Sequence, residues 1–289
     1  MKNVLFLGGS SLLATIWSNH WKGKFNIIMT QHHQEIEDNE IKIIRLKEIS
    51  QSTVKTVLSS YQIDILINCI GLTSVEQCEA NPIKANFLNA EVPLILAKIC
   101  RKERTRLVHI STDHLFDGIL RSRTEIDKPS PLNHYAKTKL KGDENVISNN
   151  PESLIIRTNF FGFGPKHKPS FSDKIIQALE NKKKINLFSD VFFSPIHVNE
   201  LAKVTNKLLN LKKSGIFNVS GNERISKYEF GKLIAEKKGI SKDFIEKGFI
   251  SQRKDLVIRP KDMSLSNLKV KNIPEIKINS LKTQINEFI

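Results

Sequence analysis

The sequence lacks the features that mark membrane, secreted and metal-binding proteins. Only three cysteines occur in 289 residues, and Cys69, Cys78 and Cys100 have no spacing typical of a metal site. No stretch approaches the roughly 20 consecutive apolar residues of a membrane-spanning helix. Met1 leads directly into a strand-like run instead of a signal peptide. We therefore expect a cytoplasmic protein with reduced, mostly buried thiols, no metal and no membrane span.

The sequence is also short of acidic residues. It has 45 Lys and Arg against 30 Asp and Glu, which gives a net charge of +15. Such a charge favours acidic partners, including nucleic acid and phosphorylated small molecules. The lysines are scattered, however, with only short clusters such as residues 182–184, and aromatic residues do not alternate with them as in nucleic-acid-binding motifs. We predict a basic solvated surface and no nucleic-acid partner.

What the chain does contain is an alternation of apolar runs and helical patterns. Several runs are aliphatic enough for strands buried on both faces. The runs lie at residues 4–7, 26–29, 41–44, 63–69, 107–110 and 154–156, and helical patterns lie at residues 50–61, 82–101 and 133–147. This alternation predicts an α/β fold with a doubly wound parallel sheet, in which ligands bind beyond the carboxyl ends of the strands.

A glycine-containing turn, G-G-S-S-L-L-A, follows the first strand-like run at residues 8–14. In a dinucleotide-binding fold the pyrophosphate lies at the N-terminus of the first helix, where glycines allow a tight turn and a close approach. If Gly8 is the first glycine of that fingerprint, Ser11 takes the second place and Ala14 the third. The turn by itself fits either a dinucleotide site or an ordinary connection between strand and helix.

The spacing of strand-like runs and helical patterns changes after residue 164. Shorter strand-like runs near residues 185–188 and 215–219 alternate with further helical patterns, and the tail is rich in lysine. We therefore predict a Rossmann-like dinucleotide-binding domain at residues 1–164 and a smaller substrate-binding lobe at residues 165–289.

The residues after the second strand-like run bear on the cofactor. An acidic side chain there typically binds the adenosine ribose of NAD, and a basic one accommodates the 2′-phosphate of NADP. This sequence has Thr30, Gln31, His32 and His33, and its first carboxylate in this region is Glu35. The pattern slightly favours NADPH over NADH.

A catalytic pattern lies within residues 107–139. An apolar run ends in Ser111, Thr112 and Asp113, and the spacing of Tyr135 and Lys139 places both on one face of a helix. A neighbouring ammonium lowers the pKa of a tyrosine. These groups have the chemistry needed to protonate a carbonyl oxygen while hydride arrives at its carbon. The alternative is a strand, a loop and a solvated helix face.

Several longer stretches carry a family resemblance. They are N-C-I-G-L-T-S-V-E-Q-C-E at residues 68–79, F-L-N-A at 87–90, H-I-S-T-D-H-L-F-D-G at 109–118, P-L-N-H-Y-A-K-T-K-L-K-G-D-E at 131–144, I-I-R-T-N-F-F-G at 155–162, S-P-I-H-V-N-E-L-A at 194–202 and I-R-P-K-D-M-S-L at 258–265. With these stretches the sequence resembles the extended short-chain dehydrogenases/reductases, and among them the dTDP-4-dehydrorhamnose reductase group. The resemblance implies an NAD(P)H-dependent oxidoreductase that reduces a nucleotide-linked 4-keto-6-deoxysugar for surface polysaccharide synthesis, and it allows a homodimer.

The resemblance also implies roles for individual residues. Thr112 would hydrogen-bond the sugar carbonyl, Tyr135 would donate the proton, and Lys139 would hold the nicotinamide ribose and tune Tyr135. The implied cofactor positions are Gly8, Ser10, Ser11, Leu12 and Leu13 at the pyrophosphate turn, Arg45 and Leu46 near the adenine, and Ile70, Gly71 and Leu72 under the cofactor. Asp113, Phe160 and Arg259 would join Thr112 in contacting the substrate, with Arg259 facing the diphosphate.

Two positions depart from the pattern of this group. Ser11 replaces the glycine of closest approach, and Phe160 stands where the rhamnose enzymes carry a tryptophan. Because a phenylalanine cannot supply the indole N–H, the change implies a different deoxysugar or a looser specificity. Two alternative functions stay open. One is a non-catalytic binding or regulatory subunit, like that of methionine adenosyltransferase, and the other is an epimerase or dehydratase on the same scaffold.

Overall fold

The computed structural model describes residues 1–32, 34–36 and 38–289, so His33 of the cofactor argument lies outside the described residues. Contacts divide the chain into two compact units that interleave along the sequence. Unit 1 consists of Met1–Ser111, Asn133–Ile156 and Leu209–Ile216, and unit 2 of Thr112–Leu132, Arg157–Leu208 and Phe217–Ile289. That residues 1–164 and 165–289 act as separate domains stays a prediction.

The elements of unit 1 alternate between strands and helices. They are β1 (Asn3–Leu7), α1 (Leu12–Trp21), β2 (Asn26–Gln31), β3 (Lys42–Arg45), α2 (Gln51–Ser60), β4 (Ile65–Asn68), α3 (Val75–Ala80), α4 (Pro82–Asn86), the π-helix η1 (Phe87–Glu91), α5 (Val92–Lys102), β5 (Arg106–Ile110), α6 (His134–Asn149), β6 (Leu154–Arg157) and β11 (Gly215–Asn218), of which the last residue of β6 and the last two of β11 belong to unit 2.

The strands of unit 1 form one sheet in the order β11-β6-β5-β4-β1-β2-β3. Neighbouring strands from β6 to β3 are parallel, and β1 lies between β2 and β4, with Val4 level with both Ile27 and Ile65. Strand order therefore reverses between β1 and β4, which is the point where doubly wound sheets bind ligands. The predicted fold class is confirmed.

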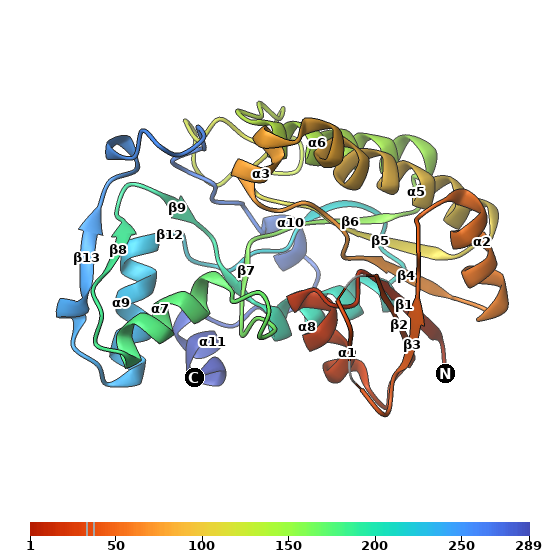
Figure 1. The fold of residues 1–289 in the computed structure, drawn as a ribbon, viewed down its shortest axis with the longest axis horizontal. Coiled ribbons are helices and arrows are strands. Elements are labelled where there is room, and N and C mark those ends of the chain that lie inside the picture. The colour runs from red at the N-terminus through yellow and green to blue at the C-terminus, as the bar shows by residue number, and fades with distance from the viewer. Residues whose placement is uncertain (33, 37) are drawn as a thin grey trace. The chain divides into compact units, whose positions relative to one another are not determined.

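Helices cover both faces of this sheet. Figure 1 shows α5 and α6 side by side along one face and α1 on the opposite face. The apolar runs explain this arrangement, since strands such as β4 are buried throughout their length and pack into a core with Leu96 of α5 and Val146 of α6. Burial on both faces is what a parallel sheet between two helix layers requires.

One predicted helix differs from the structure. Residues 82–101, expected to form one helix, instead form α4, the π-helix η1 and α5. Pro93 supplies no N–H to a continuous helical ladder, and the side chain of Asn89 in η1 bonds to groups outside the helix. Gly142 of α6 also comes so close that a Cβ there would lie 2.2 Å from the Asn89 carbonyl oxygen. The π-helix is thus set by tertiary contacts.

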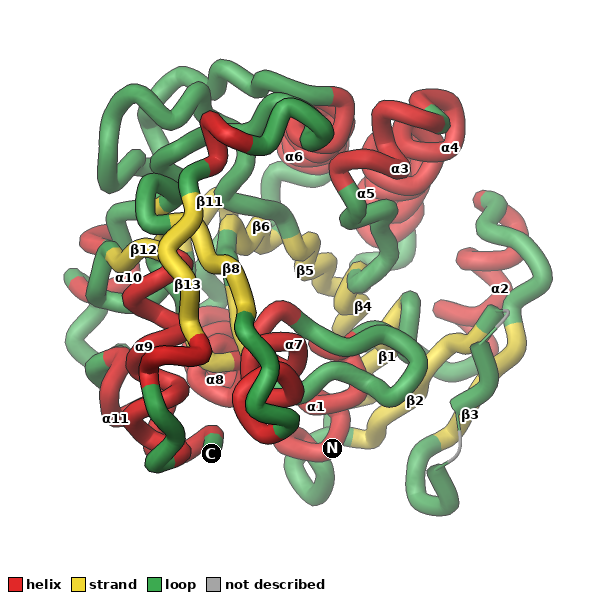
Figure 2. Tube along the Cα trace, turned by 60° about the vertical axis from the view of Figure 1, so that its left-hand side comes forward, coloured by secondary structure: helices red, strands yellow, loops and turns green. Residues whose placement is uncertain are grey.

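Unit 2 consists of short strands and helices around an aromatic core. Its elements are β7 (Phe160–Phe161), α7 (Phe171–Glu180), β8 (Ile185–Phe188), β9 (Phe192–Phe193), β10 (Ile196–His197), α8 (Val198–Asn210), β12 (Ile225–Ser226), α9 (Lys227–Lys238), the 3-10 helices η2 (Lys242–Phe244) and η3 (Ile250–Gln252), β13 (Ile245–Gly248), α10 (Leu268–Lys271) and α11 (Leu281–Phe288), of which the last two residues of α8 belong to unit 1. Figure 2 shows β8 beside β13, its parallel partner. Phe161, Phe193 and Phe230 are buried in the core of the unit.

None of the helices within residues 1–32, 34–36 and 38–289 could cross a membrane. The three cysteines are free thiols, and Cys78 and Cys100 are buried. Burial raises the pKa of Cys69 and of Cys100 to about 12. The prediction of mostly buried thiols is confirmed.

Candidate active site

The turn after β1 has the conformation that a pyrophosphate-binding turn requires. Gly8 has φ +88°, and its N–H donates to Thr30 Oγ1 at 3.0 Å. A Cβ on Gly8 would lie 3.0 Å from Ile70 Cγ1, and one on Gly9 would lie 2.8 Å from the Thr30 carbonyl oxygen. Because only glycine fits such close approaches, the turn leaves an uncovered backbone directly before α1. These residues fit a dinucleotide phosphate group.

Ser11, which replaces the expected glycine, caps helix α1. Its side-chain oxygen accepts a hydrogen bond from the Ala14 N–H at 3.2 Å. Ser10, Leu12 and Leu13 flank this cap, and Leu13 is buried in the core. The serine thus satisfies one of the free N–H groups at the helix start and leaves others for a ligand.

The segment after β4 is held by two asparagines. Asn68 Oδ1 accepts from the Ile70 N–H at 3.1 Å, and Asn89 accepts from the Leu72 N–H at 2.9 Å and donates to the Leu72 carbonyl oxygen at 3.0 Å. A Cβ on Gly71 would lie 3.1 Å from Asn89 Oδ1. These hydrogen bonds hold the segment at residues 70–72 in place at the carboxyl end of the sheet. All three of its residues are predicted cofactor contacts.

Asn89 also links that segment to the helix of the predicted catalytic pair. Its Nδ2 donates to Thr138 Oγ1 at 3.1 Å, and Thr138 lies between Tyr135 and Lys139 on α6. Sequence analysis did not identify Asn89 as a site residue. The available signal was its place in the F-L-N-A stretch at residues 87–90, which carries the family resemblance. Asn89 is fully buried, so its polar side chain needs partners on other elements.

Tyr135 and Lys139 lie near the start of α6, as the sequence predicts. Asn133 caps the helix by accepting from the Ala136 N–H at 2.9 Å, and both Tyr135 and Lys139 are buried. The Lys139 ammonium donates to the Ile110 carbonyl oxygen, at the end of β5, over 2.7 Å. Burial lowers the pKa of Lys139 to about 8, although the charge of Asp143 opposes the change. The pair is fixed in position instead of lying on a solvated face.

Behind Lys139 lies a buried polar network that sequence analysis did not identify. Asn68 Nδ2 lies 3.0 Å from His109 Nδ1, and His109 Nε2 lies 3.7 Å from Asp143 Oδ1. Burial, reinforced by the charge of Lys139, lowers the pKa of His109 well below its ordinary value. The imidazole is therefore neutral, and the side-chain amide of Asn68 donates to its Nδ1. His109 precedes Ile110 in β5, so the network supports the strand end whose carbonyl oxygen accepts from the Lys139 ammonium.

Two further residues predicted to contact the adenine lie at the end of β3. Arg45 is exposed and pairs with Gln31 of β2, whereas Leu46 is buried. The Leu46 N–H donates to the Gln31 carbonyl oxygen at 2.9 Å, and His32 Nδ1 lies 2.7 Å from the Leu46 carbonyl oxygen. Of the two, only Arg45 presents its side chain to solvent.

All the predicted cofactor residues lie in unit 1, and the predicted substrate residues lie in unit 2. In unit 2, Asp113 is buried, and its two oxygens accept from Asn159 Nδ2 at 2.6 Å and from Thr112 Oγ1 at 3.3 Å. Burial raises the pKa of Asp113, while Asn159 and the charge of Lys227 oppose that change. Asp113 and Thr112 thus form one hydrogen-bonded pair.

Phe160 and Arg259, the other predicted substrate residues, are half-buried. Phe160 lies on β7 in register with Ile196. The segment that follows Arg259 lies against the turn at Gly118, which has φ +79°. A Cβ on Gly118 would lie 2.7 Å from the Cβ of Pro260. The charge of Arg259 acts on His114, whose pKa is lowered to about 3 mainly by burial.

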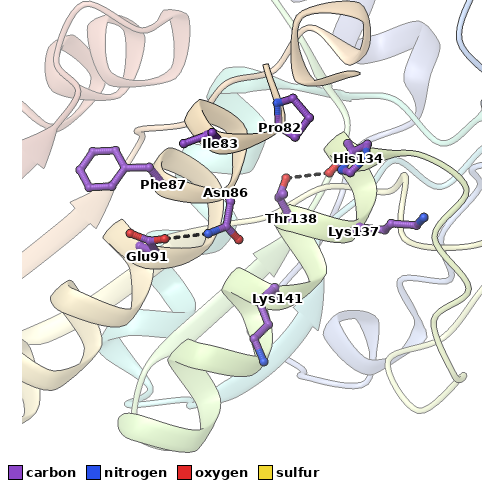
Figure 3. A pocket seen from close by; sticks show the side chains of 9 residues that line it. All are labelled: Pro82, Ile83, Asn86, Phe87, Glu91, His134, Lys137, Thr138 and Lys141. Carbon is purple, nitrogen blue, oxygen red and sulfur yellow. Dashed lines mark hydrogen bonds between the residues drawn. The ribbon is translucent and has the colours of Figure 1, made fainter. Parts of the chain in front are cut away.

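A separate pocket lies against the face of α6 that carries His134, Thr138 and Lys141. Figure 3 shows that it is lined by Ile83 and Phe87 on one wall and by His134, Thr138 and Lys141 on the other. The last three lie three and four residues apart, so they share one helix face, and Tyr135 and Lys139 lie on another. The pocket contains none of the predicted catalytic or cofactor residues.

A parallel doubly wound sheet, a glycine turn before α1 and a buried Tyr-Lys pair on α6 define the short-chain dehydrogenase/reductase class. A family model described as RmlD substrate binding domain matches residues 2–289. The chain belongs to this family, whose reductases are NAD(P)H-dependent oxidoreductases on a Rossmann-like scaffold. The predicted family is confirmed.

Three similar proteins illustrate the range of the family. The chain is 28% identical over 259 residues to a probable low-salt glycan biosynthesis reductase of Haloferax volcanii, covering 88% of this chain and 86% of that one. It is 29% identical to methionine adenosyltransferase 2 subunit beta of Xenopus laevis, covering 66% of this chain and 59% of that one. The fold is shared with a dTDP-4-dehydrorhamnose reductase of Bacillus anthracis in complex with NADP, with a TM-score of 0.85, 23% identity and coverage of 100% and 99%.

Proposed function

We propose that this protein reduces the keto group of a nucleotide-linked 4-keto-6-deoxysugar with NADPH or NADH, in the synthesis of a surface polysaccharide. The observation that carries the proposal is the fixed Tyr135 and Lys139 pair, whose ammonium is held at the carboxyl end of β5 by Ile110. A regulatory subunit has no need for a buried lysine of lowered pKa beside a buried tyrosine. Cytoplasmic location and a homodimer stay predictions.

The proposed chemistry divides hydride and proton between cofactor and protein. When bound, the nicotinamide supplies a hydride to the carbonyl carbon. Tyr135 donates its phenolic proton to the carbonyl oxygen, and the ammonium of Lys139 stabilises the phenolate that remains. Thr112 contacts the sugar oxygen. The glycine turn at Gly8 and the segment 70–72 hold the cofactor.

We propose NADPH as the preferred cofactor. The exposed guanidinium of Arg45 at the end of β3 supports this choice, because a 2′-phosphate is bound best by an accessible cation. NADH remains a substrate at lower affinity, since the ribose and pyrophosphate contacts are common to both cofactors. Steady-state assays with each cofactor measure the ratio directly, and NADPH is expected to have the lower KM.

The experiment that tests the function is cofactor oxidation with dTDP- and other nucleotide-linked 4-keto-6-deoxysugars. Tyr135→Phe is expected to lower kcat by at least about 100-fold, which is the usual contribution of a general acid. Tyr61→Phe, which changes a tyrosine that packs against the unit 1 core and is none of the predicted site residues, is the matched control and is expected to keep full activity. No turnover with any sugar, or full activity in Tyr135→Phe, contradicts the proposal.

A second candidate function is a regulatory subunit. The likeness to methionine adenosyltransferase 2 subunit beta favours it, as does the serine at position 11 in place of a glycine. Binding of NADPH does not separate the two functions, because a regulatory subunit can bind a cofactor too. Turnover separates them, and product analysis in the same assay also reveals an epimerase or dehydratase.

A further inference from the structure

The proposed chemistry gives no role to His109, a fully buried histidine of unit 1. It lies in β5, level with Asn68 of the neighbouring parallel strand β4. The next residue, Ile110, has the carbonyl oxygen to which Lys139 Nζ donates over 2.7 Å. A buried polar ring costs free energy unless its nitrogens face suitable groups. Both nitrogens of His109 face side chains of other elements, so the ring joins parts of the site that are distant in sequence.

The orientation of Asn68 determines where the imidazole carries its proton. Asn68 Oδ1 accepts from the Ile70 N–H at 3.1 Å, so the nitrogen end of this amide points at His109, with Nδ2 3.0 Å from Nδ1. An amide nitrogen only donates, and His109 Nδ1 must therefore accept. A neutral imidazole whose Nδ1 accepts has its proton on Nε2. Asn68 thus serves the Ile70 backbone with one end of its amide and His109 with the other.

The protonated nitrogen of His109 faces helix α6. Nε2 lies 3.7 Å from Asp143 Oδ1, and both side chains are almost fully buried. This distance is longer than a hydrogen bond, so the N–H acts on the carboxylate as a dipole, an interaction that is strong where water is excluded. Asp143 lies four residues after Lys139 and eight after Tyr135, so the three share one helix face. A restraint on Asp143 is therefore a restraint on the part of α6 that carries the catalytic pair.

We propose that His109 is a positioning residue: through Asn68 it restrains the segment at residues 70–72, and toward Asp143 it restrains helix α6. The inference rests on the proposed function, in which that segment holds the cofactor and α6 carries the catalytic pair. One buried ring then sets the position of the cofactor relative to the proton donor. His109 acts on the reaction through these neighbours, and its two ring nitrogens have separate tasks.

Two substitutions of His109 separate these tasks. The amide of an asparagine occupies the place of Nδ1 and that of a glutamine the place of Nε2, so His109→Asn keeps the link to Asn68 and His109→Gln keeps the one toward Asp143. In His109→Gln the amide of Asn68 loses its acceptor, so NADPH is expected to bind about 10-fold more weakly, with kcat within about 3-fold of wild type. His109→Asn is expected to lower kcat about 10-fold and to keep NADPH affinity within about 3-fold, because small misplacements of a catalytic group reduce the rate.

Leu107→Ala is the matched control for a general loosening of β5. Leu107 is buried in the same strand, level with Leu66, and packs in the apolar core of unit 1. Its truncation is expected to lower the free energy of unfolding while NADPH affinity and kcat stay within about 3-fold of wild type. Urea unfolding measures the stability, fluorescence titration the NADPH affinity, and steady-state assays the kcat. A merely structural histidine would make both His109 variants behave like this control.

NMR tests the state of the ring directly. Two-bond 1H–15N correlation spectra of the protein labelled with 15N-histidine distinguish the two neutral tautomers from the imidazolium, and the signal of His109 is the one that His109→Asn lacks. We expect the neutral Nε2–H form to persist between about pH 5.5 and 8, because burial and the charge of Lys139 lower the pKa of His109. The Nδ1–H form, or an imidazolium in this range, overturns the proposal.

The outcomes distinguish this role from the proposed function. If the two His109 variants change NADPH affinity and kcat alike, or no more than Leu107→Ala does, the positioning role is overturned and the reductase function stands. A wild type that binds NADPH and reduces no 4-keto-6-deoxysugar overturns the proposed function and with it the role of His109 in the reduction. The hold of His109 on residues 70–72 is then decided by the NADPH affinity of His109→Gln and by the tautomer.

Discussion

The ammonium of Lys139 donates a hydrogen bond to the carbonyl oxygen of Ile110, which joins helix α6 to the end of strand β5. This contact holds the side chain of Lys139, which comes from helix α6, at the carboxyl edge of the sheet. The ammonium of Lys139 is buried, and this burial lowers its pKa to about 8. The charge of Asp143 offsets the effect of burial only in part. The position of the catalytic pair is thus obtained at a cost in stability.

That cost predicts how stability depends on pH. The pKa of Lys139 is about 8 in the folded protein and 10.5 in the unfolded chain, so the unfolded chain holds more protons between these values. The free energy of unfolding therefore gains about 1.4 kcal/mol per pH unit from Lys139 as pH rises through this window. Lys139→Met lacks this gain. Urea unfolding at several pH values measures it, with the exposed Lys137→Met as control.

In this experiment the difference between wild type and Lys139→Met is the informative quantity, because it cancels the titration of all other groups. If the two proteins show parallel pH dependence between pH 8 and 10.5, the ammonium of Lys139 is not buried as described.

The glycine turn predicts a specific effect of Gly8→Ala. Gly8 and Gly23 both have positive φ, of +88° and +77°, but a Cβ on Gly8 meets Ile70 at 3.0 Å and one on Gly23 meets nothing within 4 Å. Both substitutions are expected to cost about 1–2 kcal/mol from the backbone, and Gly8→Ala about 1 kcal/mol more from crowding. Only Gly8→Ala is expected to weaken NADPH binding, by at least about 10-fold. Fluorescence titration measures this, and equal affinity in the two variants would count against a pyrophosphate at this turn.

Asn89 is predicted to stabilise both the segment after β4 and the helix α6. Asn89→Ala removes the partners of the Leu72 backbone groups and of Thr138, so it is expected to cost about 3 kcal/mol in the free energy of unfolding. Asn86→Ala, an exposed asparagine in the preceding helix, is expected to cost less than about 0.5 kcal/mol. Chemical unfolding of both variants is the measurement. Similar costs would show that the contacts of Asn89 contribute little.

Much of the fold could be predicted because its signals are local. The apolar runs of β1, β4 and β5 are long enough to identify buried parallel strands, and Gly8 ends the first of them. Tyr135 and Lys139 could be recognised from their spacing and from the stretches around them. In each case a few neighbouring residues contain the information.

The other parts of the site depend on residues far apart in the chain. Lys227 carries no sequence signal that distinguishes it from the other lysines, and only the folded chain brings it to Phe171 and Phe193. The π-helix at residues 87–91 likewise follows from contacts of Asn89. His109 lies within an apolar strand pattern that gives no sign of its polar partners.

The most direct test of the central claim follows the hydride itself. The protein is supplied with NADPH carrying deuterium at the transferable position of nicotinamide C4 and with dTDP-4-keto-6-deoxyglucose, and the sugar product is examined by mass spectrometry and NMR. We predict one deuterium at sugar C4 and none elsewhere, with at least about 100-fold slower formation in Tyr135→Phe. A product without deuterium at C4, or equal rates in the two proteins, would contradict the reductase mechanism.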